Sequence, residues 1–230
     1  MPSDVQLILG DCREAMRAMG DGSVDVVITD PPYAAKTHDG ARTTKPGRDL
    51  TVTKLIGFEC MTEDSFISFC RECVRLSRRW VVMTCDWRHA AAAEAAGLPV
   101  IRCGVWVKPD AAPQFTGDRP GTGWEAVLIL HRKGRKRWNG GGHHAVWRCP
   151  VSRSPDHPTS KPVSLIMEWL RLFSDEGDTV LDPYMGGGST GVGCLRMRRR
   201  FVGIEIDTTY FTSAERRIRA EENRYPLFQE

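Results

Sequence analysis

The chain has 230 residues, of which 41% are hydrophobic and 27% are charged, and its formal net charge is +3. These values fit one domain with a substantial core and exclude a disordered or fibrous protein. The sequence contains neither a signal-peptide pattern nor a run of about 20 apolar residues. We therefore expect a soluble, cytoplasmic protein with no membrane contact.

The amino-terminal part predicts two strands that both end in polar residues. Residues 5–9 form a short apolar run, and CREAMRAM at 12–19 has helical spacing. The β-branched segment VDVVIT at 24–29 predicts a second strand, which ends at Asp30 because the two prolines that follow cannot continue a central strand. Residues 34–60 have little periodicity and predict a long functional loop.

The rest of the chain alternates apolar strands with helices. The expected elements are helices at 63–78, 87–97, 162–174, near 189–198 and after 207, and strands at 80–85, 100–108, 124–132, 179–183 and 201–207. Strand 124–132 is expected to return antiparallel beside strand 100–108. The alternation predicts an α/β fold with a mainly parallel sheet, in which ligands bind beyond the carboxyl ends of the strands.

Eight cysteines are scattered through apolar stretches, a distribution typical of reduced core residues rather than of a disulfide framework. Cys70 and Cys73 form a C-x-x-C pair inside FISFCRECVRL, which predicts one amphipathic helix. No second close pair with metal spacing follows in the sequence, so we expect no metal site.

The segment TVLDPYMGGGSTG at 179–191 predicts a cofactor turn. Asp182 ends the strand, and the glycines that follow let the backbone approach a ligand closely before the next helix. Glu205 ends the next strand, where a carboxylate can accept hydrogen bonds from both ribose hydroxyls. The pattern indicates an adenosine-containing cofactor, although by itself it also fits a dinucleotide site or a tight strand-to-helix turn.

Asp30-Pro31-Pro32-Tyr33 follows a different strand and suits chemistry on the amino group of a base. Such a nitrogen is a poor nucleophile because its lone pair is delocalised into the ring. The Asp30 carboxylate and the carbonyl of Pro31 or Pro32 can each accept an N–H bond, which favours a pyramidal nitrogen. Tyr33 can stack on a base rotated out of a duplex. For these four residues alone, an exposed turn is the alternative.

The chain resembles the beta group of DNA amino-methyltransferases, in which the catalytic tetrapeptide precedes the cofactor loop. LILGDCREAMRAMGDGSVDVVITDPPY resembles the opening of that family, and HPTSKPVSLIMEWL, GDTVLDPYMGGGSTGVGC and FVGIEID resemble its cofactor half. The resemblance covers most of the chain. It implies one domain over residues 1–230 with a Rossmann-like S-adenosylmethionine-dependent methyltransferase fold: a mainly parallel seven-stranded sheet with an antiparallel strand and helices on both faces.

The resemblance also implies roles for individual residues. Asp30, Pro31, Pro32 and Tyr33 would hold the target base. The residues implied around S-adenosylmethionine are Asp11, Cys12, Asp30, His157, Thr159, Lys161, Asp182, Pro183, Tyr184, Gly186, Gly188, Glu205 and Asp207. Among these, Asp11 would bond the adenine amino group, Glu205 would hold the ribose, and Lys161 would contact the methionine end.

DNA is the implied partner, and inserts at 34–60, 109–123 and 133–156 are the candidate recognition elements. RKGRKRWNGGGHH at 132–144 joins basic residues to Trp138 and flexible glycines, which suits phosphate contact and base wedging, with a loose surface loop as the alternative. The sequence leaves a homodimer open.

Three classes of function compete. We favour in-line methyl transfer to N6 of adenine, because the resemblance implies this target when position 30 is Asp rather than Ser, and N4 of cytosine is the first alternative. An NAD-dependent oxidoreductase would explain the glycine turn and Glu205 but leaves Asp30 to Tyr33 without a role. A binding module without turnover would not need an intact Asp30 and Glu205. The favoured hypothesis requires the strand ends that carry Asp30 and Asp182 to share one cleft.

Overall fold

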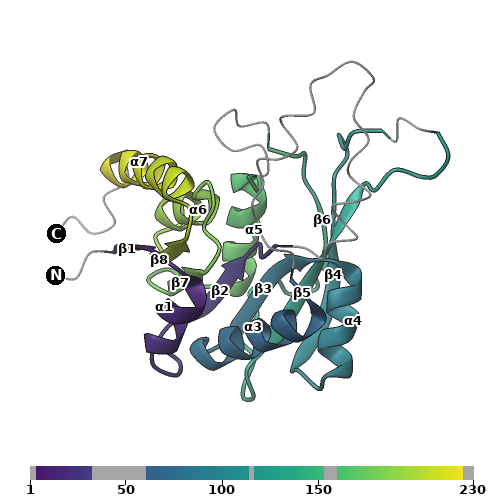
Figure 1. The fold of residues 1–230 in the computed structure, drawn as a ribbon, viewed down its shortest axis with the longest axis horizontal. Coiled ribbons are helices and arrows are strands. Elements are labelled where there is room, and N and C mark those ends of the chain that lie inside the picture. The colour runs from purple at the N-terminus through teal and green to yellow at the C-terminus, as the bar shows by residue number, and fades with distance from the viewer. Residues whose placement is uncertain (1–3, 33–60, 114–116, 153–159, 225–230) are drawn as a thin grey trace.

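One mixed β-sheet separates two layers of helices (Figure 1). The computed structural model describes residues 4–32, 61–113, 117–152 and 160–224. The strands are β1 (Val5–Leu9), β2 (Val26–Thr29), β3 (Trp80–Cys85), β4 (Val100–Val107), β5 (Trp124–His131), β6 (Val146–Arg148), β7 (Thr179–Asp182) and β8 (Arg200–Glu205). The helices are α1 (Cys12–Ala18), α3 (Glu63–Leu76), α4 (Trp87–Ala95), α5 (Val163–Phe173), α6 (Ser189–Arg196) and α7 (Thr208–Arg224).

The strand order is β1-β8-β7-β2-β3-β5-β4-β6. β5 is antiparallel to both of its neighbours, β3 and β4, and every other neighbouring pair is parallel. The expected mainly parallel α/β sheet and the antiparallel return of 124–132 are therefore confirmed. The described sheet has eight strands rather than the expected seven, because three residues of the 133–156 segment pair with Val105–Val107 on β4.

Each helical layer follows from the apolar stripe of its helices. α5, α6 and α7 bury one core against the sheet, and α1, α3 and α4 bury a second core on the opposite face (Figure 1). On α5, the apolar residues at helical spacing, Leu165, Ile166, Trp169, Leu170 and Phe173, are all buried. The expected helices on both faces are thus confirmed.

Local sequence signals fix where the helices begin. Asp11, Thr62 and Asp86 are the N-caps of α1, α3 and α4, and each side chain accepts a backbone N–H of the first turn. The helix expected at 63–78 ends at Leu76, two residues early, because the chain turns into β3. Cys70 and Cys73 both lie on the buried face of α3 within the core.

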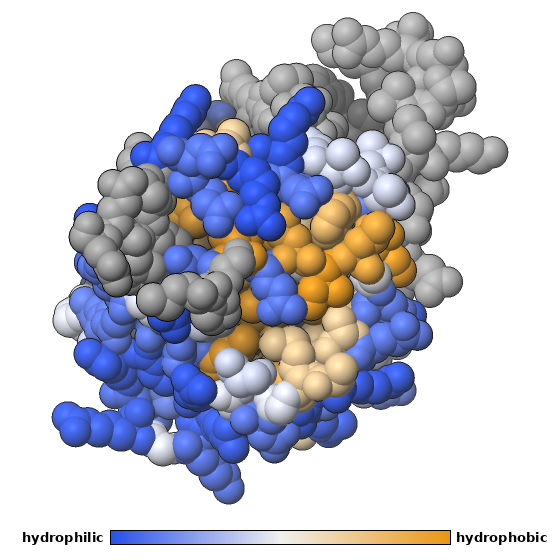
Figure 2. Space-filling model, turned by 90° about the vertical axis from the view of Figure 1, so that its left-hand side faces the viewer, coloured by the Kyte–Doolittle hydropathy of each residue, from blue (hydrophilic) through white to orange (hydrophobic). Residues whose placement is uncertain are grey.

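The edge of the sheet formed by β1 carries an exposed apolar area. Figure 2 shows this side of the molecule, with an apolar area surrounded by hydrophilic residues. Leu9, the last residue of β1, is 50% exposed, and Ile206, directly after β8, is 59% exposed. The two lie close together because Leu9 pairs with Glu205 in the sheet. Within the described residues, none of the helices has the length and hydropathy to span a bilayer.

Candidate functional site

The two strand ends that carry the candidate motifs are neighbours. β2 and β7 pair in parallel, with Val26 opposite Val180 and Val27 opposite Leu181. Their carboxyl ends therefore meet at the same edge, which places Asp30 beside Asp182. The chain continues from β2 to β3 on one side and from β7 to β8 on the other, so this is the point where the strand order reverses. Such a reversal opens a crevice for a ligand in α/β sheets.

Both carboxylate oxygens of Asp30 have protein partners. The Thr84 hydroxyl, from the carboxyl end of β3, donates to Oδ1, and the Lys161 ammonium donates to Oδ2. Of the two prolines that follow, Pro31 is buried and Pro32 is partly buried. The chain thus holds the Asp30 carboxylate in one orientation at the mouth of the crevice.

Lys161 also belongs to a row of alternating charges. Its Nζ lies 3.4 Å from Oε2 of Glu125, and Oε1 of Glu125 lies 2.5 Å from Nζ of Lys108. Both lysine nitrogens lie near the Trp106 ring: Nζ of Lys161 is 5.8 Å from the ring centroid and Nζ of Lys108 is 5.1 Å from it. Burial alone would lower the pKa of Lys161, but the carboxylates of Asp30 and Glu125 outweigh it and raise the pKa. Lys161 is therefore held as a cation.

Asp182 is buried beside the crevice, with 3% of its surface exposed. Its Oδ2 accepts the Thr190 hydroxyl at 2.6 Å and its Oδ1 accepts the Tyr184 backbone N–H at 3.1 Å. Burial raises the pKa of this carboxyl to about 6, and the nearby charge of Asp30 adds to the effect against those hydrogen bonds. Asp182 therefore titrates close to neutral pH.

The turn after β7 depends on glycine. Gly186 has φ 50° and Gly188 has φ 73°, backbone conformations that side chains with a Cβ disfavour. A Cβ on Gly188 would also lie 3.1 Å from Cβ of Ala214 on α7. The turn can therefore pass close both to a ligand and to α7, and it leads directly into α6, whose N-cap is Gly188.

Glu205 ties this turn to the end of β8. Its Oε2 accepts the Gly186 N–H and its Oε1 accepts the Asp207 N–H, each at 2.9 Å. The residue is 5% exposed, and burial raises the pKa of its carboxyl. The Asp207 carboxylate binds the next helix instead: its Oδ1 accepts the N–H groups of Thr209 and Tyr210 at the start of α7.

Asp11 and Cys12 lie at the neighbouring end of β1. The Asp11 carboxylate accepts hydrogen bonds from Arg13, which lower its pKa. Cys12 is buried close to Tyr184, and the Tyr184 ring packs edge-on against Phe69 at 5.2 Å. Cys12 and Tyr184 thus contribute to the core beneath the crevice.

The structure brings many of the predicted site residues together near the carboxyl ends of β2, β7 and β8: Asp30, Lys161, Asp182, Pro183, Gly186, Gly188 and Glu205. Tyr33, His157 and Thr159 lie outside the described residues. The sequence interpretation missed Thr84, Lys108, Glu125 and the exposed Ile206. A signal existed for Thr84, since it is a polar residue near the end of the apolar strand WVVMTC. Glu125 required knowledge of which strand β5 pairs with.

Comparison with known proteins decides the family. Residues 24–216 match the N6/N4 methyltransferase family described as DNA methylase. The chain belongs to this DNA methylase family. The type II methyltransferase M2.DpnII of Streptococcus pneumoniae is 25% identical over 242 residues, covering 94% of this chain and 90% of that protein.

Solved structures agree with the fold of this DNA methylase. The crystal structure of the M1.HpyAVI–SAM complex has a TM-score of 0.66 and 24% identity, covering 93% of this chain and 99% of that one. The PvuII DNA methyltransferase, cytosine-N4-specific, has a TM-score of 0.72 and 16% identity, covering 97% and 93%. The Rossmann-like methyltransferase fold and the family expected from the sequence are confirmed, and the oxidoreductase alternative has no support.

Proposed function

We propose that this DNA methylase uses S-adenosylmethionine to methylate N6 of adenine, acting on a base rotated out of the DNA. The observation that carries the proposal is the pairing of β2 with β7, which brings the Asp30 carboxylate beside the glycine turn and Asp182. An acceptor for the reacting amino group and a cofactor turn then border one crevice. DNA methylation itself follows from the family.

The residues present fit S-adenosylmethionine. Glu205 ends β8, as a ribose-binding carboxylate should, and Gly186 and Gly188 leave no Cβ between the turn and a ligand. The exposed Ile206 next to Glu205 offers an apolar contact to an adenine ring. When bound, the cofactor would supply the methyl group. Asp11, at the neighbouring strand end, would face the adenine amino group, and His157, Thr159 and Lys161 would lie toward the methionine end.

Asp30 would act on the amino group of the target base. Its carboxylate would accept one N–H, a carbonyl of Pro31 or Pro32 would accept the other, and the proton lost on methylation would leave through Asp30. Tyr33 would stack on the rotated base. Lys161 donates to Asp30 before substrate arrives, and Glu125 offers Lys161 a second carboxylate when Asp30 turns to the base.

Adenine is preferred over cytosine because position 30 is Asp rather than Ser. N4 of cytosine is the second candidate, and the similarity of the fold to the cytosine-N4-specific PvuII enzyme favours it. We further propose one catalytic domain over residues 1–230, acting in the cytoplasm, with inserts 34–60 and 109–123 contacting DNA near the site.

The test is transfer of tritium from methyl-labelled S-adenosylmethionine to DNA, followed by digestion to nucleosides and identification by mass. N6-methyl-2′-deoxyadenosine is the expected product, and N4-methyl-2′-deoxycytidine would identify cytosine rather than adenine as the target. Asp30→Ala and Asp30→Asn should each lower turnover by roughly 100-fold or more while cofactor binding persists. Unchanged turnover in both variants would refute the catalytic assignment.

A further inference from the structure

A second cavity lies away from the crevice just described. It has a volume of about 660 Å³, and its walls include Trp80, Trp138, Trp147 and Phe173, with Arg102 and Lys136 among the polar residues that line it. Trp80 is the first residue of β3 and pairs with His131, the last of β5. The end of the cavity formed by Trp80 and Trp138 therefore lies at the amino end of β3, whereas Asp30 and Thr84 lie at the carboxyl ends of β2 and β3.

The distance between Trp80 and the carboxyl end of the sheet follows from the length of β3. Five residue steps separate Trp80 from Cys85, which is about 16 Å at the usual rise of a strand. The part of the cavity beside Trp80 and Trp138 is thus outside the catalytic crevice.

The aromatic wall is fixed in place by its own loop. The Trp138 indole N–H donates to the Gly141 carbonyl at 2.8 Å, and a Cβ on Gly140 would lie 2.2 Å from the Trp138 ring. The ring also packs against Phe173, with centroids 5.1 Å apart. Trp138 nevertheless keeps 36% of its surface exposed. This indole is therefore held in place by its loop while part of it remains accessible from solvent.

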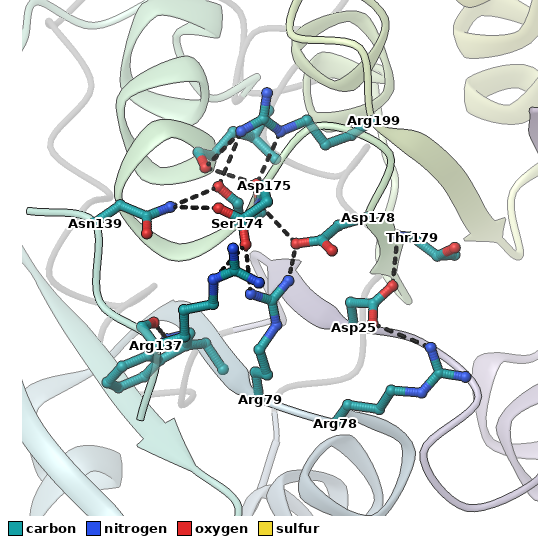
Figure 3. A network of polar contacts seen from close by, with 12 residues as sticks. Asp25, Arg78, Arg79, Arg137, Asn139, Ser174, Asp175, Asp178, Thr179 and Arg199 are labelled. Carbon is teal, nitrogen blue, oxygen red and sulfur yellow. Dashed lines mark hydrogen bonds and ion pairs between the residues drawn. The ribbon is translucent and has the colours of Figure 1, made fainter. Parts of the chain in front are cut away.

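The loop that carries Trp138 is anchored on both sides of that residue (Figure 3). The Trp80 indole N–H donates to the Arg137 carbonyl at 2.6 Å, and Nε of Arg137 lies 3.0 Å from Oδ2 of Asp175. The Asn139 amide donates to the Ser174 carbonyl and to Oδ1 of Asp175, each at 3.0 Å. The interpretation of 132–144 as a loose surface loop is therefore wrong for this part of it.

Positive charge lies in and beside the cavity. Lys136 and Arg102 line it, and Lys133 and Arg135 precede Lys136 in the same loop. All four are exposed, and among the described residues none of them forms an ion pair within 4.0 Å. Arg137, by contrast, is paired with Asp175. Unneutralised cations beside an aromatic wall are the arrangement that proteins use for single strands, with phosphates on the cations and bases stacked on the rings.

We propose that this cavity is a second nucleic-acid site, which takes an unpaired base of single-stranded DNA against Trp138 and holds the adjoining phosphates on Lys133, Arg135 and Lys136. The indole faces accept any base, because every base has a π-face, so the site should show little sequence preference. It goes beyond the proposed methyl transfer, because it involves neither Asp30 nor the glycine turn.

The test uses a fluorescein-labelled oligothymidylate of about 12 nucleotides, within the usual footprint of a stacking groove. Thymine has no exocyclic amino group, so it lacks the reacting group that Asp30 is proposed to hold. Anisotropy titration of the full chain should show binding, and an abasic oligonucleotide of equal length should bind at least several-fold more weakly. Equal binding of the two oligonucleotides would overturn the proposal in favour of simple attraction between these positive charges and a polyanion.

Variants distinguish the contribution of base stacking from that of the phosphate contacts. Trp138→Ala should weaken oligothymidylate binding roughly 10-fold and abolish the preference over the abasic strand, while Trp138→Phe should retain it. Lys133→Glu/Lys136→Glu should reduce the slope of log affinity against log salt by about 1.4, since each single-strand phosphate contact contributes about 0.7. Arg71→Glu/Arg216→Glu, an equal charge change at exposed positions on α3 and α7, is the matched control.

Turnover on a duplex substrate keeps the outcomes distinct. Methyl transfer by Trp138→Ala should stay within about twofold of the wild type at saturating DNA, which also shows that the variant is folded. Loss of turnover in parallel with loss of oligothymidylate binding would assign Trp138 to the catalytic crevice and overturn the proposal. An equal loss of binding in the Arg71→Glu/Arg216→Glu control would also overturn the proposal, because the position of the positive charges would then not matter.

Discussion

Replacing Asp182 with asparagine should stabilise the protein at neutral pH while weakening its function. The Asp182 carboxyl has a pKa of about 6 in the folded chain, against an ordinary value of 3.8, because burial disfavours its charge. Below about pH 3.8 the carboxyl is neutral in both states, so burial costs little. As pH rises, the Asp182 carboxyl ionises first in the unfolded chain. The folded state therefore becomes progressively less stable until the carboxyl also ionises in the folded chain, near pH 6.

The magnitude follows from the shift. A difference of about two pKa units corresponds to about 3 kcal/mol, most of which develops between about pH 4 and pH 7. The neutral Asp182→Asn side chain avoids this cost. Its rearranged bonds to Thr190 and Tyr184 add a contribution that does not depend on pH. The stability of the variant relative to the wild type should therefore rise by about 2 kcal/mol across this range.

Urea unfolding at about pH 4, 5.5 and 7 measures the difference. Thr190→Val is a useful companion, because it removes a hydrogen bond that lowers the pKa of Asp182 and should steepen the loss of stability as pH rises. A relative stability of Asp182→Asn that is the same at all three pH values would refute the reasoning, whatever its sign. Weaker binding of the cationic cofactor by the variant at pH 7 is expected from the lost charge.

Three further substitutions test other parts of the chain. Gly191→Ala would place a Cβ 2.6 Å from Cδ1 of Ile218, so we expect a loss of about 1–3 kcal/mol in urea unfolding, partly restored by adding Ile218→Val. Arg79→Met removes the cation that the partly buried carboxylates of Asp175 and Asp178 share (Figure 3). The free energy of unfolding should fall by about 3 kcal/mol, which a lower midpoint of thermal denaturation would show. Thr84→Val removes a donor to Asp30 and should reduce kcat roughly 10-fold in a steady-state methylation assay with little change in unfolding free energy.

The sequence predicts the elements of this fold well because their signals are local. Alternating apolar runs and amphipathic stretches place the expected helices and strands within a few residues, and the strand-end positions of Asp30, Asp182 and Glu205 follow from polar residues after buried runs. β6 is the exception. Its three residues lie in a Gly- and His-rich segment, and they become a strand only because β4 offers an edge to pair with.

Contacts across the sheet are where prediction from sequence ends. Lys161 is 131 residues from Asp30 along the chain, and nothing in HPTSKP indicates that its ammonium meets that carboxylate. The resemblance placed Lys161 toward the methionine end of the cofactor, which depends on the same cation. Glu125 and Lys108 come from the antiparallel pair β4 and β5, whose register sets them side by side. Strand order, rather than residue pattern, therefore determines which charges surround the site.

That row of charges constrains how Asp30 can take up a substrate. Releasing Lys161 from Asp30 without another partner would leave a partly buried cation uncompensated, and an unpaired buried charge is costly. Glu125 removes this difficulty, because its Oε2 already lies 3.4 Å from Lys161 while its Oε1 stays with Lys108. A small movement of the Lys161 ammonium from one carboxylate toward the other would free one oxygen of Asp30 for an amino group. The number of charges buried in the crevice would not change. Glu125 on the antiparallel strand β5 therefore lets an Asp30 oxygen exchange Lys161 for an amino group at a small cost in free energy.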